Sequence, residues 1–369
     1  MIKQYYKEIV NPATGRKRKT KFWYAKGKIT IDGKRIDYYK AGFTSDEAAR
    51  SYENNLIIKA RADINNEITY EDLFNLYLED YQKDGKLRTY QDFQQLYDNR
   101  IKEYFGNMKI SAITNAKIRI WQQSLLETTK KDGTHFSNSY LDKIQSLFKM
   151  PLNYGLKHGF IDKNINFEKI KFRSEKKKEM KFYSPEEFNS FIDAADTLKY
   201  KAFFLTLYFC GLRKGEALAL TWNDIDFKNK CIKIEKTYDS RNRIVTTPKT
   251  NNSYRTVLIP ERCLEALKEL KYYYKIKSKD MDRFVFGYFA PFGLTPLELA
   301  NKNYAQKANL KKIRIHDFRH SHVTYLLSQG ISAFAIAKQI GDTPEMVNNT
   351  YGHLLKESKE LIVSAFNNI

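Results

Sequence analysis

The sequence contains little cysteine. Its 369 residues include only Cys210, Cys231 and Cys263, and no two of these have the spacing of a paired motif. A disulfide-rich secreted scaffold is therefore excluded, and a zinc site built on cysteine pairs is not indicated. We interpret the three residues as buried, reduced thiols of a cytoplasmic protein.

Long apolar runs are also lacking. No apolar stretch of the sequence approaches the roughly 18 residues that a membrane span requires. The N-terminal MIKQYYKEIV has no apolar core of the kind that a secretory signal contains. The sequence therefore predicts neither a membrane segment nor a signal peptide.

Acidic residues are few relative to basic ones. Lys and Arg number 64 against 43 Asp and Glu, which gives a net charge of +21. Such an excess attracts polyanions, and without a membrane segment the leading candidates are DNA and RNA. Hydrophobic residues make up 42% and aromatic residues 14%, which is enough to bury cores. The length predicts two or three domains.

Residues 1–65 are predicted to form a small basic domain of a sheet and one helix. Up to Phe43 the segment has twelve Lys and Arg against three acidic residues. Aromatic and β-branched runs around Asp32-Gly33 predict a hairpin, and Thr44 with Glu47 fits a capping box. The basic residues form either a solvated face or a DNA-binding surface. The candidate DNA contacts are Lys17, Arg18, Lys19, Lys21, Trp23 and Lys26.

Residues 66–170 are predicted to form a compact helical domain. Four amphipathic segments have apolar stripes that are most simply explained as core. Thr69 and Thr114 fit N-caps, Gly106 is expected to close the second helix, and Pro151 is expected to kink the fourth.

A third domain is predicted over residues 182–369, after a linker at residues 171–181. The linker is charged and has no apolar stripe. Ser184-Pro185-Glu186-Glu187 then combines an N-cap, a first-turn proline and an acidic third position, which together predict the start of a helix.

Two cationic residues in this domain stand beside predicted turns. Arg213 follows a glycine break in GLRKGEALALTW, where its guanidinium can face a phosphate and Glu216 can hold it in place. Lys249 lies beside a polar turn between two strand-like arms of RNRIVTTPKTNNSYRTVLIP. Either residue, taken alone, is equally explained as an ordinary surface charge.

The segment IRIHDFRHSHVTYLLSQG concentrates polar groups at a predicted helix start. His316 and Arg319 are three residues apart and share one helical face, with His320 and His322 close by. A metal site is the alternative, but Asp317 is the only carboxylate available and Arg319 would repel a cation. We therefore predict no metal at this cluster.

Four segments of this domain together resemble the motifs of tyrosine recombinases of the phage-type or mobile-element integrase group. They are GLRKGEALALTWNDID, TPKTNNSYRTVLIP, HDFRHSHVTYLLSQG and IGDTPEMVNNTYGHL, and they occur in the family's order. The resemblance implies a multidomain, mainly helical fold with small β-sheets. Its parts would be an N-terminal arm-type DNA-binding domain of a sheet plus a helix, a helical SAM-like core-binding domain and a mixed α+β catalytic domain.

The resemblance also implies the chemistry. Tyr351 would attack a DNA phosphodiester to leave a 3′-phosphotyrosine link and a free 5′-hydroxyl, with bond energy conserved and no cofactor required. Arg213 and Arg319 would stabilise the charge of the transition state, and Lys249 would protonate the leaving oxygen. His316 would either accept the tyrosine's proton or hold the phosphate.

Asp342 departs from the family's pattern. It lies nine residues before Tyr351, where the family usually has a phosphate-donating His or Trp. Three interpretations remain open. Asp342 or Thr343 caps the helix that starts at Pro344; Asp342 orients an Arg or Lys; or Asp342 is protonated and donates as His would. His353 also fits the family pattern but is not taken as a substitute donor.

The expected partners follow from the same resemblance. They are double-stranded DNA attachment sites and a homotetramer on that DNA, with an excision factor or a DNA-bending protein as further candidates, in the cytoplasm at the nucleoid. A C-terminal apolar stripe at Leu361, Ile362, Ala365 and Phe366 docks either on its own domain or on a neighbouring protomer. The rival functions are a type IB topoisomerase and a non-catalytic DNA-binding protein.

Overall fold

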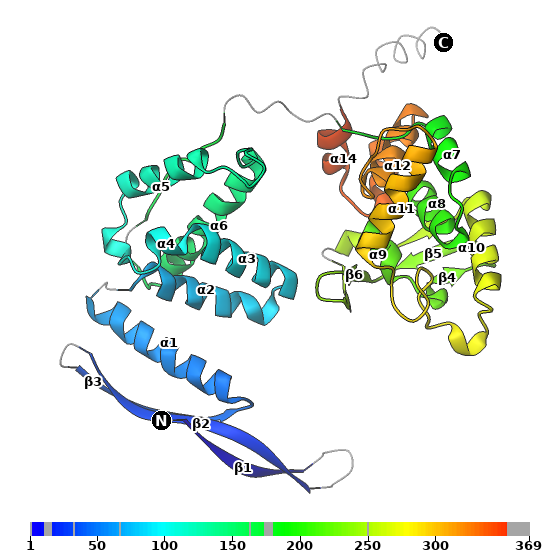
Figure 1. Ribbon diagram of the computed structural model, residues 1–369. Coiled ribbons are helices and arrows are strands. Elements are labelled where there is room, and N and C mark those ends of the chain that lie inside the picture. The colour runs from blue at the N-terminus through cyan, green and yellow to red at the C-terminus, as the bar shows by residue number, and fades with distance from the viewer. Residues whose placement is uncertain are drawn as a thin grey trace, which may run out of the picture. The chain divides into compact units, whose positions relative to one another are not determined.

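The chain forms two compact units, Met1–Lys177 and Lys178–Ile369, in a computed structural model (Figure 1). The structure describes residues 2–10, 17–31, 34–65, 68–161, 164–172, 180–248 and 251–352. Each unit has its own apolar core.

The first unit begins with an antiparallel three-stranded sheet of order β1-β2-β3. Ile31 of β2 lies opposite Lys34 of β3, which confirms the predicted hairpin, although Asp32 and Gly33 themselves lie outside the described residues. Helix α1 follows the sheet. The bounds are Ile2–Val10 for β1, Lys17–Ile31 for β2, Lys34–Phe43 for β3 and Asp46–Asn65 for α1.

The predicted cap of α1 was wrong by one residue. The hydroxyl of Ser45, not of Thr44, accepts the backbone N–H of Ala48 at 3.1 Å. The helix starts at Asp46, so the residue that immediately precedes it is the one positioned to cap.

Helices α2 to α6 complete the first unit. Thr69 caps α2 in a capping box with Asp72, and Thr114 caps α5, as predicted. The helix expected to run to Gly106 is instead broken at Ile101, whose φ of −123° and ψ of −43° leave the helical region. The bounds are Tyr70–Asp84 for α2, Leu87–Arg100 for α3, Lys102–Phe105 for α4, Asn115–Glu127 for α5 and Asn138–Lys157 for α6.

Pro151 lies inside α6 without ending it. It is buried, as are Phe148 and Leu152 of the same helix. Gln145 is also fully buried, and its amide is bonded to Gln122 and to the carbonyl of Ile170. The core of this unit is therefore apolar packing around one satisfied polar pair.

The second unit packs helices around small sheets. Ser184 caps α7 in a capping box with Glu187, and Pro185 opens the helix, as predicted. The helices are α7 (Pro185–Asp193), α8 (Leu198–Cys210), α9 (Lys214–Ala219), α10 (Glu261–Tyr273), α11 (Leu294–Lys307), α12 (Asp317–Ser328), α13 (Ala333–Ile340) and α14 (Pro344–Tyr351). Cys210 and Cys263 are buried, but the prediction of a buried thiol was wrong for Cys231, which is only half-buried.

The strands of the second unit do not pair as predicted. The arms on either side of Lys249 were expected to form one hairpin. Instead β7 pairs with β6, whereas β8 pairs with β5 in a separate sheet of order β4-β5-β8. The bounds are Ile225–Asp226 for β4, Cys231–Ile234 for β5, Thr237–Asp239 for β6, Ile244–Thr246 for β7 and Arg255–Leu258 for β8.

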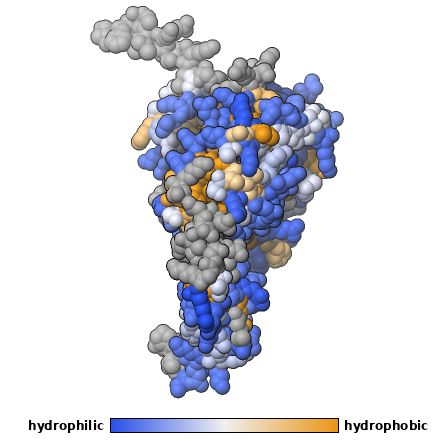
Figure 2. Space-filling model, turned by 90° about the vertical axis from the view of Figure 1, so that its left-hand side faces the viewer, coloured by the Kyte–Doolittle hydropathy of each residue, from blue (hydrophilic) through white to orange (hydrophobic). Residues whose placement is uncertain are grey.

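The surface reflects the composition. Hydrophilic residues predominate on the face shown in Figure 2, in keeping with the net charge of +21. Among the described residues, no helix combines the length and the apolar composition needed to cross a membrane.

Candidate active site

Arg213 is positioned by a sharp break between α8 and α9. Helix α8 ends at Gly211 in the left-handed conformation, with φ of 64°, and Arg213 is the N-cap of α9. Glu216 accepts the backbone N–H of Arg213 at 2.9 Å and its guanidinium Nη1 at 3.0 Å. This confirms that Glu216 holds the arginine, as the sequence predicted.

Glu216 is itself almost fully buried, at 3% exposure. Burial acts to raise the pKa of its carboxyl, but hydrogen bonds from Arg255 and the charges of Arg255 and Arg213 outweigh burial and lower it. The carboxylate is therefore ionised at neutral pH, where it can accept hydrogen bonds from a guanidinium and fix its orientation.

Arg319 reaches the same place from α12. It is 3% exposed, and its Nη1 donates to the carbonyls of Gly211 at 2.8 Å and Ile340 at 2.7 Å. Burial, followed by the charge of Arg213, lowers its pKa to about 10, which leaves it cationic at neutral pH.

Asp342 joins the two arginines. Its Oδ2 accepts from Nη2 of Arg213 at 2.9 Å and from Nη2 of Arg319 at 3.2 Å. The contact with the arginines agrees with the interpretation that Asp342 orients them. The cap of α14 is Thr343, whose hydroxyl accepts the N–H of Met346 at 3.2 Å, as the other open interpretation allowed.

Three arginines donate hydrogen bonds to the carbonyls at the C-terminal end of α13. Gln339 accepts from Arg255, Ile340 from Arg319, and Gly341 from Arg213, at 2.9, 2.7 and 3.1 Å. These carbonyls have no partner within the helix, and cations at a helix C-terminus are favoured by its dipole. The arginines therefore fix the segment that leads into α14.

Arg255 was missed in the sequence. It lies at the start of β8, its side chain is 5% exposed, and it pairs with both oxygens of Glu216, Nη2 to Oε2 at 2.9 Å. A signal was present, because an arginine at an inward position of the strand YRTVLI must find a carboxylate. The sequence alone does not identify which carboxylate that is.

Tyr351 lies at the end of α14 and is 5% exposed. Its ring joins an apolar cluster with Val323, Ile336 and Val347 from α12, α13 and α14. Its hydroxyl is hydrogen-bonded to Nδ1 of His320, with ring centroids 5.6 Å apart. Burial raises the pKa of Tyr351 to about 12, so the hydroxyl is neutral until a base takes its proton.

His320, rather than His316, is therefore the histidine that contacts the tyrosine. His316 precedes α12, and its ring lies edge-on to His320 at 4.9 Å. Desolvation, then the neighbouring His320 and Arg319, lower the pKa of His316, which is uncharged at neutral pH. The sequence placed His320 in this cluster, but spacing alone could not choose between the two histidines.

Some predicted site residues lie outside the described part of the chain. These are Lys249, His353 and the C-terminal stripe at Leu361, Ile362, Ala365 and Phe366. Lys249 stands between β7 and β8 in the chain, and these strands belong to different sheets.

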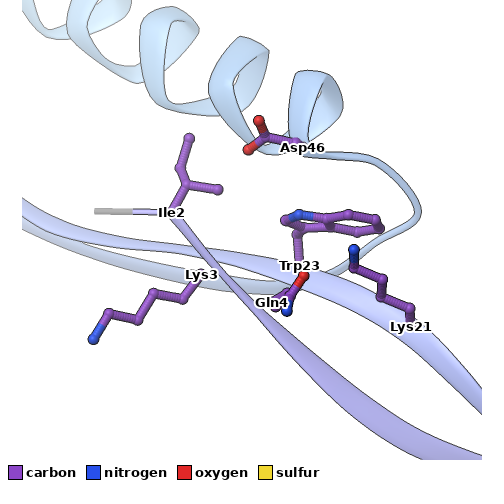
Figure 3. A pocket seen from close by; sticks show the side chains of 6 residues that line it. All are labelled: Ile2, Lys3, Gln4, Lys21, Trp23 and Asp46. Atoms are coloured by element: carbon purple, nitrogen blue, oxygen red, sulfur yellow. The ribbon is translucent and has the colours of Figure 1, made fainter.

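The candidate DNA contacts of the first unit lie along β2. All of them are exposed except Trp23, which is half-buried. Figure 3 shows Trp23 and Lys21 side by side in a shallow pocket that Asp46 also lines. The Lys21 ammonium lies 4.6 Å from the Trp23 ring centre, within the range of a cation–π contact.

The assembled site is suited to an anion. Two guanidinium groups converge on one carboxylate oxygen, and both are preorganised by further bonds. The charge of Arg319 also acts to lower the pKa of the buried Tyr351 hydroxyl. In the described part of the chain, no three His, Cys, Asp or Glu side chains gather as metal ligands.

Comparison with known proteins identifies two family models in the chain. The phage integrase family matches residues 181–358, and the N-terminal SAM-like domain of phage integrases matches residues 69–126. The ICEBs1 integrase of Bacillus subtilis is 29% identical over 343 residues, covering 88% of this chain and 90% of that protein. A XerC-like tyrosine recombinase of Caldanaerobacter subterraneus is 27% identical, covering 82% and 84%.

Solved structures share the fold. The Tn1549 transposon integrase bound to transposon right end DNA superposes with a TM-score of 0.61 at 18% identity, over 76% of this chain and 94% of that one. A lambda integrase tetramer bound to a Holliday junction gives 0.55 at 13% identity, over 91% and 95%.

Proposed function

The chain belongs to the phage integrase family of tyrosine recombinases, and on that premise we propose which of its residues cleave and rejoin DNA. It is a site-specific DNA recombinase that works through a covalent 3′-phosphotyrosine intermediate and integrates and excises a mobile element. Tyr351 is the nucleophile. Arg213 and Arg319 bind the scissile phosphate, His316 assists them, and Lys249 protonates the leaving 5′-oxygen.

The observation that carries this assignment is the convergence of Arg213 and Arg319 on the carboxylate of Asp342. A carboxylate between two guanidinium forks occupies the position that suits a phosphate oxygen, since both anions accept paired N–H donors. In the pentavalent transition state the phosphate oxygens gain negative charge. Fixed cations stabilise that charge without reorganising, and loss of one such donor costs on the order of 100-fold in rate.

The surroundings of the tyrosine support its role as nucleophile. Tyr351 ends a helix that follows directly on the segment held by the arginines. The hydroxyl faces the polar start of α12 through His320, while its ring is fixed in an apolar cluster. A nucleophile held in this way loses little freedom when it reaches the phosphorus.

The remaining assignments concern domains and partners. We assign residues 1–65 to arm-type DNA binding, 66–170 to core-site binding, 171–181 to a linker and 182–369 to catalysis. The substrate is double-stranded attachment-site DNA in the cytoplasm. The active assembly is a homotetramer, to which an excision factor or a DNA-bending protein is added for one direction.

A nicked suicide substrate tests the function. The duplex has the attachment-site sequence, taken from the junction between the element and its flanking DNA, with a nick beside the cleavage position so that religation is prevented. The wild-type protein should accumulate a covalent protein–DNA adduct that survives denaturation, and Tyr351→Phe should form none. Tyr272→Phe is the matched control, because Tyr272 is 86% exposed on α10 and should leave the yield unchanged. An adduct that persists in Tyr351→Phe would refute the assignment.

A further inference from the structure

The hydrogen bond between His320 and Tyr351 gives the histidine access to the reacting atom. Nδ1 of His320 faces the tyrosine hydroxyl, and on the other side of the ring Nε2 lies 4.0 Å from Oδ1 of Asp317. The His320 side chain is 15% exposed and that of Asp317 is 2% exposed. The imidazole at the start of α12 therefore has a carboxylate near one ring nitrogen and the tyrosine hydroxyl of α14 at the other.

Asp317 is held rigidly behind the imidazole. Its two carboxylate oxygens accept from Nε and Nη2 of Arg314 and from the backbone N–H of the same residue, at 2.7 to 3.1 Å. A fixed carboxylate near Nε2 favours the tautomer with the proton on that nitrogen. The lone pair of Nδ1 is then free to accept from the tyrosine hydroxyl.

We propose that His320 is a catalytic residue: it takes the proton of Tyr351 as the tyrosine oxygen attacks phosphorus, and Asp317 positions it. This rests on the proposed function, because it assigns the base for the same nucleophile. Neither the sequence motifs nor the similar proteins assign this role to His320.

The protonation states agree with the role. Burial, partly offset by Asp317, lowers the pKa of His320, so the imidazole is neutral and basic at neutral pH. The tyrosine hydroxyl has its pKa raised to about 12 by burial, so its spontaneous ionisation is rare and a partner within hydrogen-bond reach is needed.

The step is balanced without an external reagent. The O–H bond of Tyr351 breaks, its proton passes to Nδ1 of His320, and the oxygen forms a bond to phosphorus. The bond from phosphorus to the 5′-oxygen breaks, and that oxygen takes a proton from Lys249, the donor proposed above. In the rejoining step the 5′-hydroxyl attacks the phosphotyrosine, and the imidazolium returns its proton to the tyrosine oxygen.

Two substrates separate this role from that of the leaving-group acid. One is the suicide substrate with its ordinary 5′-oxygen, and the other carries a sulfur at the bridging 5′-position, which leaves without a proton. The sulfur substrate should restore Lys249→Ala to near the wild-type rate of adduct formation. His320→Asn should remain on the order of 100-fold slow on both substrates, which is the usual contribution of a positioned base.

Asparagine is the informative replacement. Its amide oxygen lies where Nδ1 lies, so it can accept the tyrosine's hydrogen bond and hold the ring, but it cannot take the proton. A merely structural role of His320 predicts a wild-type rate in His320→Asn. That result would overturn the proposal, and so would rescue of His320→Asn by the sulfur substrate.

The wild-type protein gives a second measurement that does not depend on the folding of a variant. On the sulfur substrate its rate should fall tenfold per unit once the pH drops below the pKa of a single base. The groups facing His320 are His316, Asp317 and Arg319 around its own helix start, Arg314 before it and Tyr351 from α14. Because burial lowers the pKa of His320, the fall should begin below the ordinary histidine value of about 6.5. A rate that shows no such fall down to the pH at which the protein unfolds would contradict the proposal. Failure of the wild type to form any adduct would instead refute the proposed function.

Discussion

Asp342 reduces the net positive charge of the proposed phosphate site. Arg213, Arg255 and Arg319 face two carboxylates, Glu216 and Asp342. A neutral donor at position 342 would leave one more net positive charge for the phosphate. The carboxylate also acts to raise the pKa of the Tyr351 hydroxyl. Asp342 therefore orders the arginines in the free protein but should compete with the phosphate that they are proposed to bind.

Replacing Asp342 tests which effect is stronger. Asp342→Asn keeps the shape and removes the charge, so we expect tighter binding of orthovanadate, a phosphate analogue, by on the order of tenfold, about 1.4 kcal/mol. The measurement is the inhibition constant of orthovanadate in the adduct assay. Asp342→His supplies a donor as well and should also accelerate adduct formation.

Glu345→Gln is the matched control, because Glu345 is exposed in the first turn of α14 and loses the same charge away from the arginines. If Asp342→Asn binds orthovanadate more weakly than the wild type, ordering of the forks outweighs the repulsion.

The sequence predicted contacts between site residues that are close together in the chain, and it missed contacts between residues that are far apart. Arg213 and Glu216 are three residues apart across one helix start, so their pairing follows from the helix geometry. The contact of His320 with Tyr351 joins residues 31 apart, and that of Arg255 with Glu216 joins residues 39 apart. Such pairs form only when α9, β8, α12 and α14 are packed together, which spacing does not reveal.

At the scale of elements, the joint between α13 and α14 depends on Gly341. This residue ends α13 with φ of +67°, and an added Cβ would lie 2.8 Å from Nη1 of Arg255 and 2.9 Å from the carbonyl of Asn252. Any side chain there is strained and also displaces the arginine that fixes Glu216.

Gly341→Ala should therefore destabilise the protein more than backbone strain alone explains. Gly330→Ala is the matched control, since Gly330 has φ of +75° with nothing within 4 Å of the added Cβ. We expect the control to lose about 1–2 kcal/mol of unfolding free energy. Gly341→Ala should lose clearly more and should also lose adduct formation. Urea denaturation measures the free energy of unfolding, and the suicide substrate measures adduct formation. Equal losses in the two variants would show that the crowding at Gly341 is relieved at no cost.

Three of the four predicted helix caps were correct for a similar reason, and the cap of α1 was wrong by one residue. Thr69, Thr114 and Ser184 cap the helices that follow them because a cap is decided within four residues. Strand pairing is decided by partners distant in the chain, and there the prediction failed. The arm before Lys249 pairs with β6 and the arm after it pairs with β5. The pairing of β8 buries Val257, which fits an apolar face seeking burial, whereas Ile244 and Val245 of β7 stay exposed.

At the scale of the whole molecule, the net charge of +21 should dominate affinity for DNA. Each phosphate contact made by a Lys or Arg releases counterions, so the logarithm of the binding constant should fall steeply with the logarithm of salt concentration. The exposed cations of β2 are proposed to make part of these contacts.

Neutralising three of the β2 cations measures how much they contribute to the salt dependence of DNA binding. The triple variant Lys17→Gln, Arg18→Gln, Lys19→Gln should reduce the magnitude of the salt slope by roughly three if all three contact phosphates. The readout is fluorescence anisotropy of attachment-site DNA across a salt series. The control is the triple variant Lys268→Gln, Lys275→Gln, Lys277→Gln, at three exposed positions on and just after α10. Figure 1 shows α10 on the side of the second unit away from α14. Equal slopes for the two variants would remove β2 from the DNA-binding surface.

The contacts of the arginines with the end of α13 make alanine substitutions of these residues difficult to interpret. Each of Arg213, Arg255 and Arg319 satisfies a main-chain oxygen that would otherwise be stranded. An alanine at any of these positions would destabilise the end of α13 and remove a proposed catalytic or positioning group at the same time. An inactive alanine variant therefore does not reveal which of the two effects abolished activity. Lysine, which retains one cation and can still reach one carbonyl, is the substitution from which chemistry can be learned.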